Sequence, residues 1–421
     1  MRCGDRITSM RKVLFSILLL QAAAAFAQPT ISAEVSSDPL PFQATPFPFA
    51  VPAIAMAKDR TGVAIAWVMR EPGGDDRIFV GRLDATAHFT GSVHSIPVLS
   101  QSMPIEAITP SLAAATNGDG FTLAWLEMPP TNSRSAQVVY CHLDAALKAS
   151  TPVALPTPAR AISSPAIARS RKTTWISASG YAWQIRGDGS IDGPFDAGMT
   201  ASDMTVATDS PQMVTGQRFV PDVTTCNAPG CSRGFRGWCT CSQFEPFYSL
   251  QFLSFPTVSS TKNFNFDAEA IPAIGSSNSD VLVALFQGTQ HTGGAVVTFR
   301  LKPSAFKDFP IAADNWRVIG HVEPDPGYSR PDIASDDERY VVVWRTTADV
   351  SGSHDIVGAS IERNGTIIPL SIATTNEDER DPSVVAVGNG RFLVAYDKLS
   401  NGERRIAGRF VTFENRAHAV R

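Results

Sequence analysis

The chain has 421 residues, with 36 Lys and Arg against 40 Asp and Glu, and a formal net charge of −4. This slightly acidic balance argues against nucleic acid or an anionic membrane surface as a partner. A hydrophobic content of 43% suffices for a packed core, and 30 Gly with 30 Pro indicate many short elements and turns. The composition therefore excludes a coiled coil, a polytopic membrane protein and a disordered chain.

The first 27 residues have the three parts of a secretory signal peptide. A basic Met10-Arg11-Lys12 precedes an apolar stretch over residues 13–20, and Ala25-Phe26-Ala27 forms an A-x-A cleavage site. The apolar stretch is too short for a membrane anchor, and no cysteine stands at the cleavage point to carry a lipid. We therefore expect removal of residues 1–27, a mature chain with no membrane span, and a secreted or periplasmic location.

A short pattern recurs through the rest of the chain: a proline, a small or polar residue, an aliphatic residue and another small residue. It begins at Pro52, Pro110, Pro165, Pro272, Pro331 and Pro382. The interval from Pro165 to Pro272 is about twice the others, so we expect a degenerate repeat hidden at residues 204–208. The chain then contains seven repeats of about 55 residues each.

The pattern within each repeat predicts four strands. The proline begins the first strand, where a missing N–H breaks no ladder bond. A tight turn leads to an apolar strand that ends in an aromatic residue, as in residues 63–67, 121–125, 340–344 and 392–396. A polar loop, a third strand and a weaker fourth strand follow, and residues 30–35 would supply the fourth strand of the last repeat.

Four antiparallel strands repeated seven times predict an all-β fold: a seven-bladed β-propeller of four-stranded antiparallel blades, its ring closed by an N-terminal strand. An open solenoid is the alternative, but no capping repeat is evident at either end. The length by itself suggests about three domains. The repeats instead predict a single domain over residues 28–421, with an insertion in blade four at residues 221–244.

The repeats resemble those of a family of exported bacterial β-propeller proteins, mostly of unassigned function. The resemblance rests on a Pro-x-aliphatic-Ala strand followed by a strand ending in aliphatic-aliphatic-Trp, and it is strongest over residues 328–413. It implies a propeller fold and export, and it implies no catalytic residues. The Ser-x-Asp-x-Gly-x-x-Trp box of sialidase-type propellers is missing from these repeats, which argues against that type.

The insertion carries four cysteines, Cys226, Cys231, Cys239 and Cys241. In an exported protein such a cluster predicts disulfides. Cys239 and Cys241 are too close to pair, which leaves 226–239 with 231–241, or 226–241 with 231–239. Zinc is the alternative ligand of four thiolates, but the spacing matches no zinc knuckle, so we predict no metal and no cofactor. Cys141 is expected to be an inert core thiol.

In a propeller, the loops between second and third strands lie on the same face as the connections between blades. We call it the loop face and expect binding there, because binding residues concentrate on loops carried by a rigid scaffold. Each kind of candidate also has a purely structural explanation. The charged residues could form salt bridges between blades, and the aromatic residues of the insertion could form the small core of a disulfide-bonded loop. The candidate ligand-binding residues on this face are Arg330, Asp332, Arg380, Asp381, Phe235 and Trp238.

These features predict a monomeric, non-catalytic module that binds a glycan or a protein through the loop face. The reason is the asymmetry between long polar loops with the insertion and the short turns opposite. The alternative is an extracellular polysaccharide hydrolase or lyase with carboxylates among Asp332, Glu379 and Asp381. A structural spacer is a third interpretation. The chain has no P-loop, G-x-S-x-G or H-E-x-x-H motif, which weakens the enzyme hypothesis.

Overall fold

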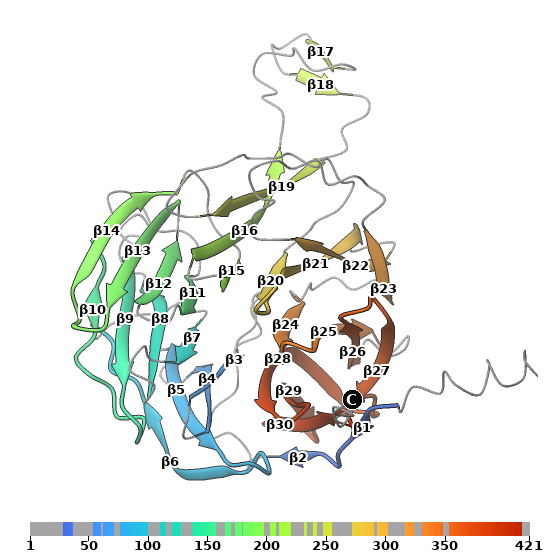
Figure 1. The fold of residues 1–421 in the computed structure, drawn as a ribbon, viewed down its shortest axis with the longest axis horizontal. Coiled ribbons are helices and arrows are strands. Elements are labelled where there is room, and N and C mark those ends of the chain that lie inside the picture. Colours follow the sequence, from blue (N-terminus) through green and yellow to red (C-terminus); the bar gives the residue numbers. More distant parts are fainter. Residues whose placement is uncertain are drawn as a thin grey trace, which may run out of the picture.

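The computed structural model is a ring of seven antiparallel β-sheets around a central axis (Figure 1). The seven-bladed all-β propeller expected from the sequence is therefore confirmed. In the part that is described, no helix is long and apolar enough to cross a membrane. The structure describes residues 28–36, 54–59, 62–70, 76–99, 110–114, 120–127, 137–156, 165–169, 173–178, 180–197, 203–207, 210–219, 231–233, 239–241, 247–254, 272–289, 293–301, 316–323, 331–347 and 353–414.

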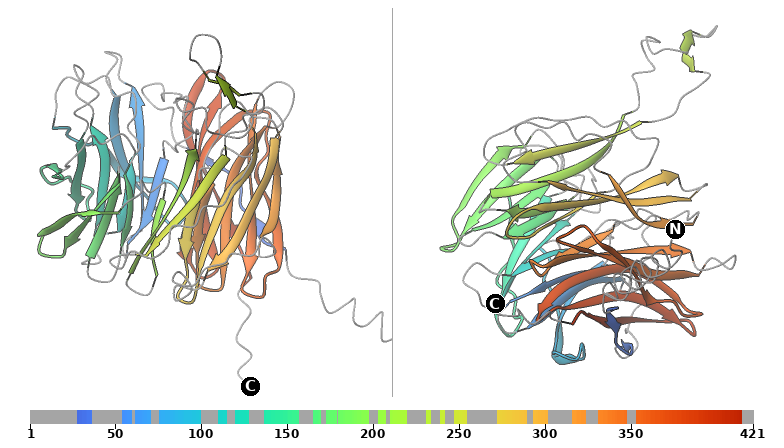
Figure 2. Two further views of the ribbon diagram at one scale, coloured as in Figure 1. Left: turned by 90° about the horizontal axis from the view of Figure 1, so that it is seen from above. Right: turned by 45° about the vertical axis from the view of Figure 1, so that its right-hand side comes forward.

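Within a blade, the strands follow one another outward from the axis in chain order (Figure 1). Blades one to three contain β3 (Ile54–Lys58), β4 (Val63–Arg70), β5 (Asp76–Leu83) and β6 (Phe89–Ser95); β7 (Ser111–Ala114), β8 (Phe121–Glu127), β9 (Gln137–Leu143) and β10 (Val153–Ala154); and β11 (Ala166–Arg169), β12 (Thr173–Ala178), β13 (Tyr181–Arg186) and β14 (Ile191–Asp196). The strands run across the thickness of the disc, so each blade has one end at each face (Figure 2).

Blade four has three described strands, and its inner strand lies where the sequence predicts the degenerate repeat. Blades four to six contain β15 (Asp203–Ala207), β16 (Ser210–Phe219) and β19 (Phe247–Ser254); β20 (Ala273–Ser276), β21 (Val281–Thr289), β22 (Gly293–Leu301) and β23 (Arg317–Val322); and β24 (Asp332–Ser335), β25 (Arg339–Thr347), β26 (His354–Glu362) and β27 (Ile367–Ala373). The inner strands of all seven blades contact one another in a closed circle.

The N-terminal segment closes the ring, as the sequence predicts. Blade seven contains β28 (Asp378–Gly388), β29 (Arg391–Ser400) and β30 (Glu403–Thr412), and β1 (Thr30–Ile31) and β2 (Val35–Ser36) both pair with the outer edge of β30. The closure therefore uses two short strands instead of one. Between them, Ser32 N donates to Phe410 O at 2.9 Å and Ser32 Oγ accepts from Phe410 N at 3.0 Å.

The apolar core lies between the blades. In β4, Ile65 and Trp67 pack with blade seven, while Ala64, Ala66 and Val68 pack with blade two. All five are at most 2% exposed. Burial of both faces explains why the second strands form continuous apolar runs in the sequence, without the alternation of a half-buried strand.

The recurring proline has two positions relative to the inner strands. Pro110, Pro165, Pro272 and Pro331 stand directly before the inner strands of blades two, three, five and six. In blade seven Pro382 lies inside β28, where the register shifts by one residue against β29. A bulge tolerates proline because a residue left out of the ladder needs no N–H.

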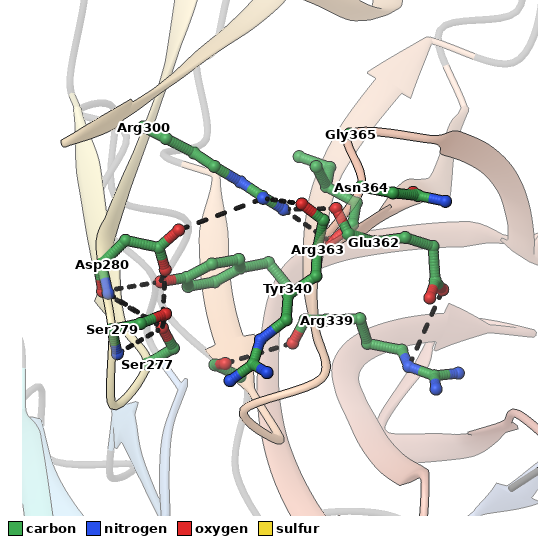
Figure 3. Close-up of polar contacts among 12 residues, drawn as sticks. Ser277, Ser279, Asp280, Arg300, Arg339, Tyr340, Glu362, Arg363, Asn364 and Gly365 are labelled. Atoms are coloured by element: carbon green, nitrogen blue, oxygen red, sulfur yellow. Dashed lines mark hydrogen bonds and ion pairs between the residues drawn. The ribbon is translucent and has the colours of Figure 1, made fainter. Parts of the chain in front are cut away.

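On the face opposite the loop face, which we call the turn face, an arginine joins blades five and six (Figure 3). Arg300 donates to the main-chain oxygens of Arg363 at 2.8 Å and Glu362 at 2.6 Å. Its guanidinium lies 5.6 Å from the centre of the Tyr340 ring, and Tyr340 Oη donates to Oδ1 of Asp280 at 2.8 Å. These bonds fix the angle between the two blades.

A similar contact joins blades one and two. Arg82 donates to Ala145 O at 2.8 Å, and its guanidinium lies 5.3 Å from the centre of the Phe121 ring. The N–H of Gly120 donates to Asp59 Oδ2 at 2.8 Å. Gly120 has a φ of 82°, and a Cβ there would collide with the neighbouring main chain, so only glycine fits. Arg300, Arg82 and Asp59 therefore serve packing between blades on the turn face.

Candidate functional site

The loop face is described best at blades six and seven. There the end of β25, the start of β26, the connection from β27 to β28 and the β29–β30 hairpin supply charged residues that interact with one another. The loops at residues 71–75, 128–136 and 348–352 lie outside the described residues. We therefore build the candidate site from the ends of blades six and seven.

The bulge in β28 places Asp381 in an unusual conformation. Arg380 pairs with Asp397 and Ser383 with Ala395, so the two residues between Arg380 and Ser383 lie opposite one residue of β29. Asp381 has a φ of 48°, in the left-handed region that non-glycine residues rarely adopt. Such strain costs about 1–3 kcal/mol and concentrates at functional sites. The bulge therefore marks this end of the blade as a candidate site.

Asp378 is held between a histidine and an arginine. His354 Nδ1 donates to Asp378 Oδ1 at 2.7 Å, and Arg380 Nη2 lies 2.8 Å from Asp378 Oδ2. Burial works to raise the pKa of Asp378, but the bonds from His354 and Arg380 overcome it and hold that pKa at about 2. Asp378 is therefore ionised at any physiological pH and fixes the orientation of both partners.

Asp397 is the opposite case. Burial raises its pKa to about 6, although Arg404 forms an ion pair with its Oδ2. The charge of Asp381 acts in the same direction as burial. Its Oδ1 has no hydrogen-bond partner among the described residues. The site thus contains two carboxyl groups with very different proton affinities.

Burial also raises the pKa of Asp381, against the positive charges of Arg345, Arg380 and Arg404. These arginines belong to β25, β28 and β30, so three strands from two blades place a guanidinium near the bulge. The side chain of Arg380 is 30% exposed and is the accessible one, since that of Arg404 is 14% exposed and Arg345 is buried.

Glu379 is fully buried beside these groups. Its Oε1 accepts a hydrogen bond from Thr375, and its Oε2 has no hydrogen-bond partner among the described residues. Burial raises the pKa of Glu379, while Thr375 and Lys398 lower it. With an exposure of 0%, Glu379 has no surface on which to meet a ligand directly.

A second cluster, next to Glu379, holds the N-terminal segment. Glu34, between β1 and β2, accepts hydrogen bonds from Lys398 Nζ at 2.6 Å and from Tyr396 Oη at 2.8 Å. Arg409 Nη2 lies 3.5 Å from the same carboxylate, and Lys398 also pairs with Glu377. These contacts hold Glu34 in one place and so fix the register in which β1 and β2 pair with β30.

The structure places the predicted site residues in different environments. Arg380 and Asp381 lie together at the bulge, as described above. Asp332 accepts hydrogen bonds on Oδ2 from Ser383 Oγ at 2.9 Å and Val384 N at 2.8 Å, so its carboxylate joins blades six and seven. The remaining candidates, Arg330, Phe235 and Trp238, lie outside the described residues.

The role of Asp332 recurs elsewhere in the ring. Asp203, at the same position of β15, accepts from Ile274 N of the next blade at 2.9 Å and from the N–H of Met204 at 2.9 Å. An aspartate at the start of an inner strand can thus hold the next inner strand. This agrees with the structural alternative that the sequence offered for the charged candidates.

Five further residues of the site were not among the sequence candidates: Arg345, His354, Asp378, Asp397 and Arg404. Each lies at the loop-face end of a strand, within or beside the polar loops that the sequence assigns to that face. The sequence does not show which loop ends meet. Residues from β26, β29 and β30 are brought together only by the pairing of strands and the packing of blades.

The cysteine-rich insertion lies between β16 and β19, the second-to-third strand connection predicted for it. Its described part is a hairpin of β17 (Cys231–Arg233) and β18 (Cys239–Cys241), which lies outside the ring in Figure 1. The main-chain register places Cys231 opposite Cys241. Directly opposed strand residues have Cα atoms about 4.5–5.5 Å apart, within the range of a disulfide. The pairing itself remains a prediction, and this register agrees with the 231–241 alternative.

Cys141 is buried, with an exposure of 0%, and burial raises its pKa to about 12. A thiol with that pKa carries almost no thiolate at neutral pH, so it is a poor nucleophile and a poor metal ligand. Among the described residues, no group of three His, Cys, Asp or Glu side chains is arranged to hold a metal ion.

No protein-family model and no curated protein sequence matches the chain. Among solved structures, a protein of unknown function from Dyadobacter fermentans is similar at 12% identity, with a TM-score of 0.48, over 92% of this chain and 100% of that one. An ulvan lyase of polysaccharide lyase family PL25 is similar at 10% identity, with a TM-score of 0.47, over 90% and 96%. A Trypanosoma rangeli sialidase is similar at 9% identity, with a TM-score of 0.45, over 90% of this chain and 59% of that one.

Proposed function

We propose that the protein is an exported propeller that binds a glycan, without chemical change, at the loop-face end of blade seven. The observation that carries this proposal is the bulge at Asp381. A strained acidic residue lies there among three arginines, next to an accessible Arg380 and a carboxyl oxygen of Asp397 that has no partner among the described residues.

The mixture of groups favours a hydroxyl-rich ligand. Each sugar hydroxyl both donates and accepts hydrogen bonds, so it is best met by donors and acceptors placed close together. At this site Arg380 and His354 are donors, while Asp378, Asp381 and Asp397 are acceptors. A protein ligand is the other outcome of the experiments below.

Export and the insertion belong to the same proposal. The signal peptide at residues 1–27 would deliver the chain to the compartment where extracellular glycans occur. The insertion at residues 221–244 belongs to the same type of connection as the loops of the site, and its aromatic residues Phe235 and Trp238 would add a stacking surface at blade four, separate from the site at blade seven.

The proposal is tested on a glycan array with the full-length mature protein. Arg380→Ala should weaken binding about tenfold or more, because a charged hydrogen bond to a ligand contributes about 1.5–3 kcal/mol. Arg186→Ala is the matched control, since Arg186 is 57% exposed and pairs with Asp192 at a turn between outer strands. Equal binding by both variants would contradict the proposed site. A variant lacking residues 221–244 that binds as tightly as the wild type would remove the insertion from the proposal.

A second candidate function is hydrolysis of a polysaccharide. It is favoured by the separation of proton affinities between Asp378, with a pKa of about 2, and Asp397, with a pKa of about 6, since a permanently ionised and a protonatable carboxyl suit acid and base roles. Of the carboxylates first considered for this function, Asp332 is bonded to the next blade and Glu379 is fully buried. Release of reducing ends from a polysaccharide panel that Asp397→Asn abolishes would support hydrolysis over simple binding.

A further inference from the structure

The ligand class at the bulge follows from the charges around Asp381. Arg345, Arg380 and Arg404 all interact electrostatically with its carboxyl, and they come from three different strands. Clustered guanidinium groups are the usual means by which proteins bind carboxylates and sulfates, because each presents several N–H donors in a fixed plane. In this structure Arg380 pairs with Asp378 and Arg404 with Asp397, and the carboxyl that feels the positive charge of all three arginines belongs to the strained residue Asp381.

We propose that the loop-face site binds an acidic group of a glycan, a carboxylate or a sulfate ester, which occupies the position next to the arginines in competition with Asp381. This inference rests on the proposed function and names its ligand class. Asp381 lies at the bulge in the left-handed region, and a ligand that supplies the same charge to the arginines would let it leave this strained conformation.

Two buried polar atoms point to the same conclusion. Oδ1 of Asp397, whose side chain is 9% exposed, and Nε of Arg380 have no hydrogen-bond partner among the described residues. Buried polar atoms in native proteins are nearly always hydrogen-bonded, so an unpartnered donor and an unpartnered acceptor on the cross-strand partners Arg380 and Asp397 indicate that a partner is to be added. A ligand oxygen that accepts from arginine, and a ligand hydroxyl that donates to Asp397, would provide such partners.

The charge balance makes this binding dependent on pH. The groups facing Asp381 are Arg345 and His354 of blade six and Arg380, Asp397 and Arg404 of blade seven. Burial raises the pKa of Asp397 to about 6, so it loses its charge in mildly acidic solution, and burial shifts the pKa of Asp381 in the same direction, while the arginines keep their charge. The site then becomes more positive, and an acidic glycan should bind more tightly at about pH 5 than at about pH 7.5.

The test uses three polymers and the full-length mature protein. Polygalacturonate carries carboxylates, dextran sulfate carries sulfate esters, and dextran is neutral. Binding of either acidic polymer, about tenfold or more tighter near pH 5 than near pH 7.5, with no binding of dextran, is the expected result. The first two polymers show which acidic group is preferred.

Two variants separate the groups. Asp381→Asn keeps the side-chain shape and tolerates the left-handed conformation, so it should fold; it should bind at about pH 7.5 nearly as tightly as the wild type does at about pH 5. His354→Gln tests protonation of the imidazole, and it should leave most of the pH dependence in place.

Three results would overturn the inference. Asp381→Asn with an unchanged pH profile would show that this carboxyl does not compete with the ligand. Dextran binding that matches the acidic polymers, and that Arg380→Ala removes, would leave the proposed glycan site standing but reject the acidic ligand class. No binding of any glycan, in the array or with these polymers, would reject the proposed function as well.

Discussion

The two faces of the ring use the same residue types in opposite ways. On the turn face, Arg300 and Arg82 donate to main-chain oxygens of the neighbouring blade and lie over aromatic rings. On the loop face, Arg380 and Arg404 meet carboxylates, and oxygens of Asp397 and Glu379 are left without hydrogen-bond partners among the described residues. Figure 3 shows the first arrangement, in which Arg300 and Tyr340 bond across the two blades, although Nε of Arg300 has no hydrogen-bond partner among the described residues.

This difference separates structural charge from charge that is available for function. A main-chain carbonyl is present at every turn whatever the side chain, so an arginine bonded to it depends on the fold alone. A carboxyl with a raised pKa is, in contrast, unfavourable for folding and persists where something else selects for it. The following predictions test whether the two ends differ in this way.

The largest expected effect on stability is at the turn face. Arg300→Ala removes bonds to the main-chain oxygens of Glu362 and Arg363 and the contact with Tyr340. We expect the free energy of unfolding to fall by about 2–3 kcal/mol, measured by urea denaturation, with glycan binding unchanged in the folded protein. Arg380→Ala should show the reverse pattern, and the comparison fails if both variants lose stability equally.

The next effect is on the pH dependence of stability. The pKa of Asp397 is raised to about 6 in the folded protein, so the folded state holds this proton more tightly than the unfolded state. Stability from this group is therefore greatest below about pH 4 and declines by about 2–3 kcal/mol as the pH rises to about 6. Asp378, with its pKa lowered to about 2, acts in the opposite direction and loses its contribution as the pH falls from about 4 to 2.

Thermal unfolding from about pH 2 to pH 8 measures both the acid loss assigned to Asp378 and the decline assigned to Asp397. Asp397→Asn should flatten the decline between about pH 4 and pH 6, and Asp378→Asn should flatten the acid limb. A decline that persists unchanged in Asp397→Asn would assign it to Glu379 or Asp381, whose pKa values burial also raises.

A smaller effect is expected at the N-terminal closure. Glu34→Gln removes the charge that Lys398 and Arg409 hold, at a cost of about 1–2 kcal/mol. Hydrogen exchange should quicken first in β1, β2 and the outer edge of β30. Glu403→Gln is the control, because Glu403 is 55% exposed and forms an ion pair with Arg405. Equal quickening in both variants would argue against a specific Glu34 pocket.

The smallest effect is at Tyr340. Tyr340→Phe keeps the ring beneath Arg300 but removes the hydroxyl that donates to Asp280. We expect a loss of about 1 kcal/mol in the free energy of unfolding and no change in glycan binding. A change in binding at the opposite face of the blade would show that the two ends are coupled.

Most of the fold follows from the sequence because its signals are local and repeated. The prolines mark the starts of inner strands, and the apolar runs that end in Trp67, Trp125 and Trp344 mark second strands buried on both faces. The repeat hidden at residues 204–208 could be placed from spacing alone, since blades of similar size must follow one another around a ring. The closure by residues 30–35 follows for the same reason, because the last repeat lacks a fourth strand.

The candidate site could be predicted only in part. Arg380 and Asp381 stand out in the sequence because they directly precede the repeat proline Pro382. The sequence gives no sign that Asp332 would bond to the next blade, that Asp381 would lie at a bulge, or that His354 and Arg404 would reach the same place. Each depends on contacts between segments far apart in the chain.

The sequence by itself thus determined the number of blades, the strand order and the face that carries the long loops, because these depend on period, apolar pattern and turn residues. Tertiary structure decided which charges meet, which are buried and which are satisfied. Those properties depend on distances between strands of two blades, and no periodic pattern encodes them. The charges that looked alike in the sequence are therefore divided by packing into blade-to-blade bonds, as at Asp332 and Arg300, and a strained, incompletely bonded group around Asp381.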